Sequence, residues 1–136
     1  MGMGPFSPAM QAGAAAADAA LHAEVTACIF FNDLLAIRAL QRFAELGVTV
    51  PGMMSVVGCD DIFGADFCSP PLTTLTAPTE DVGRLATDML LDRIHATTKP
   101  SRPLPERVRV PARLTIRKST GALARIGPRM IADAAK

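Results

Sequence analysis

Two apolar runs separated by an amphipathic stretch place the strongest constraint on the fold of this chain. Val25–Phe31 (VTACIFF) is continuous and rich in β-forming residues, as expected of a strand buried on both faces. Met54–Cys59 (MSVVGC) is a second such run, and Pro51-Gly52 turns the chain into it. Because the connections are short, we predict a right-handed βαβ unit. The predicted fold class is therefore α/β, a parallel sheet in a three-layer αβα arrangement.

The stretch between these runs has the features of a helix with one apolar face. Asn32 is a suitable N-cap, Asp33 places an acid in the first turn, and Gly47 is suited to the C-terminal end. The apolar stripe comprises Ala36, Leu40, Phe43 and Leu46.

The remaining elements are predicted from caps, propensity and alternation. Ser7-Pro8 should begin a helix that runs through the alanine-rich Ala9–Leu21. Thr79 should cap a helix over Glu80–His95, with an Arg84–Asp88 pair on its polar side. Short strands are expected at 72–75, 108–110 and 114–116, with a break at Pro111. We assign 1–12 to a flexible N-terminal segment, 13–120 to the folded domain and 121–136 to a tail.

Composition argues against several classes of protein. The 136 residues are 49% apolar and 20% charged, enough for one domain with a core. Cys28, Cys59 and Cys68 form no CxxC pair and have no histidine at ligand spacing, so we expect neither a metal site nor a disulfide framework. With no signal peptide and no apolar run near the roughly 20 residues that span a bilayer, a soluble cytoplasmic protein is expected.

Positive charge is concentrated towards the C-terminus. Residues 1–97 hold four basic and eleven acidic side chains, whereas residues 98–136 hold ten basic and two acidic ones. A nucleic-acid-binding tail would show this asymmetry, but arginines on the exposed sides of strands would show it too. The absence of Tyr and Trp leaves few rings on which bases could stack.

Polar side chains follow both predicted buried strands. Asn32-Asp33 comes after the first and Asp60-Asp61 after the second. Ligands of open parallel sheets bind beyond the carboxyl ends of the strands, so neighbouring strands would bring Asn32 and Asp60 to one crevice. An amide beside a carboxylate can bind sugar hydroxyls or the ring N–H groups of a base. Alternatively, Asn32 is only a helix cap and Asp60-Asp61 only a turn.

The residues give little indication of catalysis. Adjacent Asp60 and Asp61 would point in different directions from one turn, and His22 and His95 lie on predicted helix surfaces far from the cysteines. The glycines match neither GxGxxG nor GxxxxGK[ST]. We predict no enzymatic activity and no cofactor.

Four motifs in order resemble the lactose-repressor family of transcriptional regulators. Phe31–Ile37 matches the family pattern "ND-x-x-A", and Gly47–Pro51 with Ser55–Asp61 matches "G-x-x-V-P … S-V-V-G-F-D-D". Further along, Pro70–Leu75 with Pro78 and Gly83 matches "P-x-L-T-T-V-x-Q-P-x-x-x-x-G". Finally, Leu114–Thr120 matches "L-x-x-R-x-S-T". The chain departs from the pattern at Arg38, where the family usually has glycine, and at Cys59, where it usually has an aromatic residue.

The resemblance implies part of the second lobe of a type I periplasmic-binding-protein-like fold. Two such lobes close on a small effector, a sugar by default or a nucleoside-like molecule, and the regulators dimerise. DNA binds through a helix-turn-helix head, which this sequence does not contain, and neither the first lobe nor the opening strands of the second are expected in it. The second lobe of a transporter's periplasmic sugar-binding protein is the alternative.

The resemblance also implies roles for individual residues. Asn32 and Asp60 would face the effector, Thr79 and Val82 would line the pocket from the next helix, and Phe6 would stack on the ligand. Ile37 and Cys68 would lie in the dimer interface, although both are also plausible core residues. Because the helix over 80–95 would normally contact the first lobe, we expect it either to pack elsewhere or to pair with a second chain.

Overall fold

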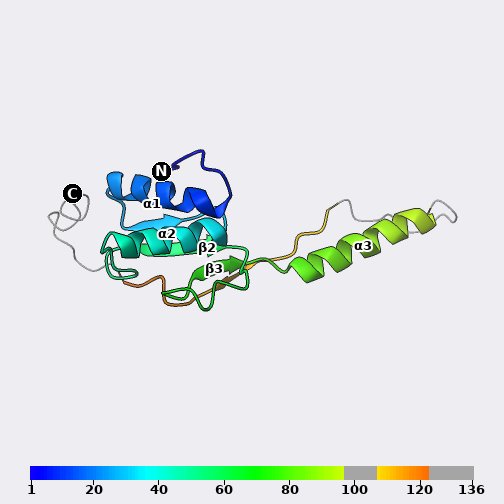
Figure 1. Cartoon of the computed structure of the whole chain (residues 1–136). Helices are drawn as coiled ribbons and strands as arrows, with labels where there is room; N and C mark the ends of the chain where they lie inside the picture. Colours follow the sequence, from blue (N-terminus) through cyan, green and yellow to red (C-terminus); the bar gives the residue numbers. More distant parts are fainter. Residues whose placement is uncertain (97–106, 123–136) are drawn as a thin grey trace. The chain divides into compact units, whose positions relative to one another are not determined.

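The computed structural model describes residues 1–96 and 107–122, and the predicted tail from 123 onwards lies outside them (Figure 1). The described residues form two compact units, one of residues 1–76 and 114–122 and one of residues 77–96 and 107–113.

A mostly parallel sheet forms the centre of the first unit. Its strand order is β1 (Ala27–Ile29), β2 (Ser55–Cys59), β3 (Thr73–Thr76) and β4 (Arg113–Thr115). β1 pairs parallel with β2, and β2 pairs parallel with β3. The α/β class and the parallel βαβ unit predicted from the sequence are thus confirmed.

Two helices pack against each other and against this sheet (Figure 1). After a short 3-10 turn, η1 (Met10–Ala12), come α1 (Gly13–His22) and α2 (Asp33–Glu45), and α2 also contacts β2. α1 lies so close to α2 that a Cβ on Gly13 would fall 2.5 Å from the Leu35 carbonyl oxygen. Arg42 joins the helices by donating from Nε to Oδ1 of Asp18 at 2.8 Å.

The predicted helix start at Ser7-Pro8 is wrong, because η1 begins at Met10 and α1 at Gly13. The Pro8 carbonyl accepts a hydrogen bond from Nδ2 of Asn32 at 2.8 Å. This contact ties residue 8 to the start of α2 in place of a helical turn.

The hydrophobic core lies between the helix pair and one face of the sheet. Phe43, Met54 and Leu72 are at most 1% exposed, and the stripe predicted on α2 supplies its centre. Cys28 and Phe30 point into this core, whereas Ile29 and Phe31 are 79% and 78% exposed. The prediction that Val25–Phe31 is buried on both faces is therefore wrong. α1 and α2 cover only one face of β1, and successive side chains alternate between faces.

The second unit contains the predicted helix, α3 (Thr79–Ala96). Arg84 pairs with Asp81 and not with Asp88, and in this pair the acid precedes the base, which is the favoured order along a helix. The strand predicted at 108–110 is absent from the described stretch 107–112, and the chain enters a strand only at Arg113. In the described part of the chain, no helix combines the length and the apolar character needed to cross a membrane.

Candidate functional site at the carboxyl edge of the sheet

Asn32 and Asp60 follow neighbouring parallel strands, β1 and β2. Ile29 is aligned with Val57 in the β1–β2 register, and three further residues along each strand lead to Asn32 and Asp60. The structure therefore places both residues at the same edge of the sheet, as the sequence predicted. In open parallel sheets this edge is where ligands bind.

The Asn32 side chain is the N-cap of α2 and ties down the N-terminal segment. Its Oδ1 accepts from the Leu35 N–H at 2.9 Å, and its Nδ2 donates to the Pro8 carbonyl at 2.8 Å. A primary amide has two donors and two acceptor lone pairs, so one of each remains for another group. The capping role expected from the sequence thus leaves Asn32 with unused hydrogen-bonding capacity.

Asp33 is fully buried, and its hydrogen bonds stabilise the carboxyl edge of the sheet. Its Oδ1 accepts from the Thr74 hydroxyl at 2.6 Å, and its Oδ2 accepts from the Ile62 N–H at 3.0 Å. A Cβ on Gly58 would collide with this carboxylate. One buried side chain therefore joins α2, β3 and the loop after β2. The sequence predicts Asp33 as an acid in the first turn of the helix, but it does not predict these long-range contacts.

Asp60 and Asp61 form a turn in which both residues have left-handed backbone conformations, with φ of 111° and 56°. Asp60 is exposed, and its N–H donates to the Leu75 carbonyl at 2.9 Å. Asp61 turns the other way, with Oδ1 accepting from Nη2 of Arg117 at 2.7 Å and Oδ2 accepting from the Thr76 hydroxyl at 2.8 Å. The two carboxylates differ in surroundings, as expected from the sequence.

Cys59 lies between the buried part of β2 and this turn. Desolvation raises the pKa of its thiol above the ordinary value, and the adjacent negative charge of Asp60 raises it further. The thiol therefore stays protonated at neutral pH. The described residues contain no group of histidine, cysteine or carboxylate side chains suited to a metal ion.

Of the other predicted effector residues, Phe6 belongs to a different part of the first unit, and Thr79 and Val82 belong to the second unit. Phe6 lines a pocket of about 690 Å³ along β1 together with Ile29 and Phe31, and neither Asn32 nor Asp60 belongs to that lining. Thr79 and Val82 are exposed residues at the start of α3, in the second unit.

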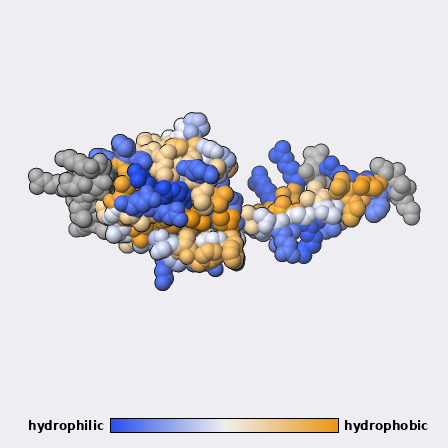
Figure 2. Space-filling model, viewed as in Figure 1, coloured by the Kyte–Doolittle hydropathy of each residue, from blue (hydrophilic) through white to orange (hydrophobic). Residues whose placement is uncertain are grey.

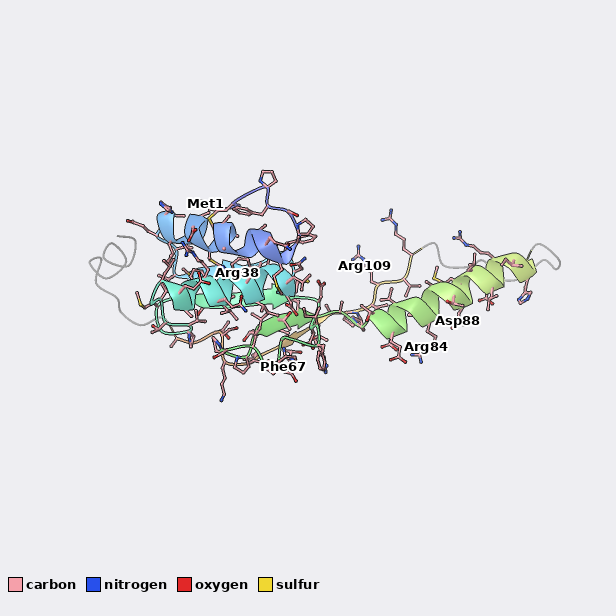
Figure 3. The ribbon with its side chains drawn as sticks, viewed as in Figure 1. Met1, Arg38, Phe67, Arg84, Asp88 and Arg109 are labelled. Carbon is pink, nitrogen blue, oxygen red and sulfur yellow. The ribbon has the colours of Figure 1, made fainter. Side chains whose placement is uncertain are left out.

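The two predicted dimer residues lie together. Ile37 on α2 and Cys68 on the loop after β2 line one groove of about 480 Å³, and both are half-buried. Phe63 and Phe67 on the same loop are 89% and 63% exposed, with their rings edge-to-face at 4.9 Å. In Figure 3, Phe67 lies on this loop and Arg38 on α2. A Cβ on Gly64 would lie 3.3 Å from Cδ1 of Ile37, so the loop lies against the helix there.

The site contains contributors that the sequence did not single out. Thr74, Thr76 and Arg117 bind the carboxylates of Asp33 and Asp61. Arg117 lies in a stretch whose arginines we expected to be exposed, yet its side chain is only 19% exposed. Its position in the closing "R-x-S-T" motif was the available signal.

A family model for the periplasmic binding protein-like domain matches residues 5–120. The chain belongs to this family. The HTH-type transcriptional repressor MelR of Bacillus subtilis is 38% identical over 94 residues, which are 69% of this chain and 26% of the repressor. The HTH-type repressor PurR of Vibrio parahaemolyticus is 35% identical over 99 residues, 73% of this chain and 30% of that protein. The chain thus spans about a quarter to a third of these relatives.

Solved structures of LacI-family transcriptional regulators show the same fold. One from Bifidobacterium animalis matches with a TM-score of 0.80 and 28% identity, over 88% of this chain and 43% of that one. Another, from Enterococcus faecium with bound ribose, matches with a TM-score of 0.76 and 30% identity over the same 88% and 43%. The chain therefore corresponds to a part of the effector-binding domain of LacI-family regulators. These relatives are regulators, which disfavours the transporter alternative.

Proposed function

We propose that this chain is the effector-sensing and dimerisation part of a cytoplasmic, non-enzymatic transcriptional regulator. The observation that carries the proposal is the β1–β2 register, which brings the amide of Asn32 and the carboxylate of Asp60 to one edge of the sheet. Donor and acceptor groups at such an edge suit a small polyhydroxylated or nucleoside-like molecule, with a sugar as the first choice. DNA contact belongs to a helix-turn-helix region outside these 136 residues.

Support for a sugar comes from the structural neighbours. The regulator from Enterococcus faecium has bound ribose, and another neighbour is the CelR–cellobiose complex. In the complete cleft, Thr79 and Val82 would add contacts from α3, and Phe6 is the aromatic residue assigned to stacking. Because an effector is enclosed between two lobes, we expect this chain alone to bind in the millimolar range, on the order of 4 kcal/mol.

The effector role is tested by titrating D-ribose, and separately inosine, into the isotopically labelled chain while the Asn32 and Asp60 NMR signals are followed. Saturable shifts at both residues are expected with one of the two probes. Asp60→Asn should weaken that binding about tenfold, because a charge-assisted hydrogen bond is lost.

Asp66→Asn is the matched control, since Asp66 is an exposed carboxylate on the same loop. It should leave the binding unchanged. An absence of saturable shifts with both probes, or equal binding by the wild type and Asp60→Asn, would contradict the effector site.

Dimerisation is assigned to the groove that contains Ile37 and Cys68 and to the neighbouring rings of Phe63 and Phe67. Exposed apolar side chains gathered on one surface are typical of protein interfaces, in which aromatic residues are enriched. Figure 2 shows hydrophobic residues on the surface of the first unit. Ile37→Asp should shift the chain towards monomer in sedimentation equilibrium.

Ile29→Asp is the control, because Ile29 is a 79% exposed residue of β1 that does not line the groove. It should leave the association constant unchanged. If the control dissociates the dimer and Ile37→Asp does not, the interface lies along β1 and this assignment is wrong.

A further inference from the structure

The turn that presents Asp60 has a backbone that needs external support. Left-handed φ values at two successive non-glycine residues are unfavourable, and they persist only where surrounding contacts fix them. Asp60 itself contributes one backbone hydrogen bond, to the Leu75 carbonyl. The side-chain contacts that join the turn to β3 and to the C-terminal segment are made by Asp61.

Arg117 is the charged partner of Asp61. Its Nη2 donates to Oδ1 of Asp61 at 2.7 Å, and its Nη1 donates to the Leu72 carbonyl at 2.8 Å. The two side chains are 19% and 15% exposed, so solvent screens their attraction less than it would on the open surface. A planar guanidinium with two separate acceptors is fixed in orientation, which a lysine could not reproduce.

The segment that carries Arg117 is itself fastened to the sheet. The Ser119 hydroxyl donates to the Val56 carbonyl at 2.6 Å and accepts from the Thr73 N–H at 2.7 Å. The Val56 N–H donates to the Ser119 carbonyl at 2.8 Å, and the Arg117 N–H donates to the Thr73 hydroxyl at 2.9 Å. These hydrogen bonds fix the backbone from which the Arg117 side chain extends. Arg117 is far from β1 in the sequence.

We propose that Arg117 is a positioning residue for the effector-facing carboxylate of Asp60, which it places by holding Asp61 and thereby the left-handed turn. The inference rests on the proposed function for the identity of the ligand, but the holding of the turn is independent of any ligand. This proposal gives the C-terminal "R-x-S-T" segment a role in shaping the effector site, in addition to its hydrogen bonds with β2 and β3.

The test measures amide hydrogen exchange by NMR in the wild type, Arg117→Met, Arg117→Lys and Asp61→Asn. Arg117→Met should speed exchange of the Asp60 amide about tenfold or more relative to the Ala39 amide in α2, because the turn opens locally. Asp61→Asn should have a similar effect, and the double variant should add little to either. Arg117→Lys should give a smaller increase in the exchange rate, because lysine retains the positive charge but lacks the planar guanidinium that reaches two acceptors.

Lys118→Met is the matched control, since it removes the neighbouring positive charge from an exposed side chain. It should leave the Asp60 amide within about twofold of the wild type. Equal acceleration of the Asp60 and Ala39 amides in Arg117→Met would reveal a general loss of stability and overturn the proposal. Unchanged exchange at Asp60 would overturn it as well.

A D-ribose titration of the same variants separates this inference from the effector role. If wild-type Asp60 responds to ribose, Arg117→Met should weaken the response about tenfold, whereas Lys118→Met should not. If wild-type Asp60 responds to neither ribose nor inosine, the proposed effector role fails, and the exchange rates still decide whether Arg117 holds the turn. Undiminished ribose binding by Arg117→Met would contradict the positioning role.

Discussion

The helices α2 and α3 are both amphipathic, but only α2 has its apolar face covered. Ala36, Ala39 and Phe43 of α2 are 0% exposed, whereas Val82, Leu90 and Ile94 of α3 are 47%, 59% and 55% exposed. The first unit supplies α1 and β2 as packing partners for α2. An apolar stripe therefore predicts that a helix has a buried side, and a matching surface must still be present to bury it.

The largest difference between the helices is expected on truncation of an apolar side chain. Phe43→Ala should lower the free energy of unfolding of the first unit by about 3–5 kcal/mol, because it leaves a cavity in a closed core. Leu90→Ala in α3 should change it by less than about 0.5 kcal/mol. Urea unfolding followed by far-ultraviolet circular dichroism suits a chain without Trp or Tyr. Similar losses in the two variants would refute the contrast.

A second difference concerns the acids at the two helix starts. Asp33→Ala should cost about 3 kcal/mol in the same unfolding assay, because buried hydrogen bonds from Thr74 and Ile62 lose their acceptor. Asp81→Ala is the counterpart in the first turn of α3, where the carboxylate is 54% exposed and pairs with Arg84. It should have little effect on the first unit. A small loss in Asp33→Ala would show that the hydrogen bonds of Asp33 are dispensable.

The free energy of unfolding of the first unit should also depend on pH in the alkaline range, because its core contains a buried thiol. Burial raises the pKa of the Cys28 thiol from 9.0 to about 11. The unfolded chain then loses this proton more readily than the folded one, so stability is full below pH 9 and falls as the pH rises towards 11. The loss attributable to Cys28 is roughly 2–3 kcal/mol. Cys28→Ala should flatten the unfolding free energy between pH 9 and 11, and an unchanged slope would show that Cys28 is not its cause.

The smallest effects are expected for surface ion pairs. Arg42 contacts Asp18 and Glu45, and these hydrogen bonds raise the pKa of its guanidinium. The hydrogen bond from Arg38, together with the one from Arg42, lowers the pKa of the Glu45 carboxyl. Arg42→Gln should lower the melting temperature slightly, because it breaks a link between α1 and α2. Arg84→Gln on α3 should have no measurable effect on the first unit. A larger effect of Arg84→Gln would mean that α3 contributes to its stability.

Local sequence signals predicted the three helices and the parallel strands in their order, but they added a strand at 108–110 that is absent and did not show how each element is covered. The strand β2, the Asn32 cap and the stripe on α2 follow from short-range patterns, and all three appear in the structure. β2 is buried on one face only, because Ser55, Val57 and Cys59 are half-buried. The apolar run at β1 gave no warning that Ile29 and Phe31 are exposed, because burial depends on what lies across the sheet. The start of α1 was misplaced because the tie between Asn32 and Pro8 joins residues 24 apart.

The sequence predicted which residues lie at the candidate site, but it did not predict the hydrogen bonds that hold them in place. Asn32 and Asp60 could be paired because each follows an apolar run, and parallel strands end at one edge. Asp33 accepts a long-range hydrogen bond from Thr74, and Asp61 accepts long-range hydrogen bonds from Thr76 and Arg117. No local pattern marks such contacts, so only the resemblance of the closing motif pointed towards Arg117.

We propose that the apolar stripe of α3 requires a partner surface that a second chain can supply. Sedimentation equilibrium of the 136-residue chain, repeated with Leu90→Asp, tests it most directly. We predict an assembly larger than the dimer formed through the Ile37 and Cys68 groove, and Leu90→Asp should reduce it to that dimer, because a charge would enter the stripe that the second chain covers. A monomer or dimer whose size is unchanged by Leu90→Asp would contradict the claim and would mean that α3 is buried within its own chain or needs no cover.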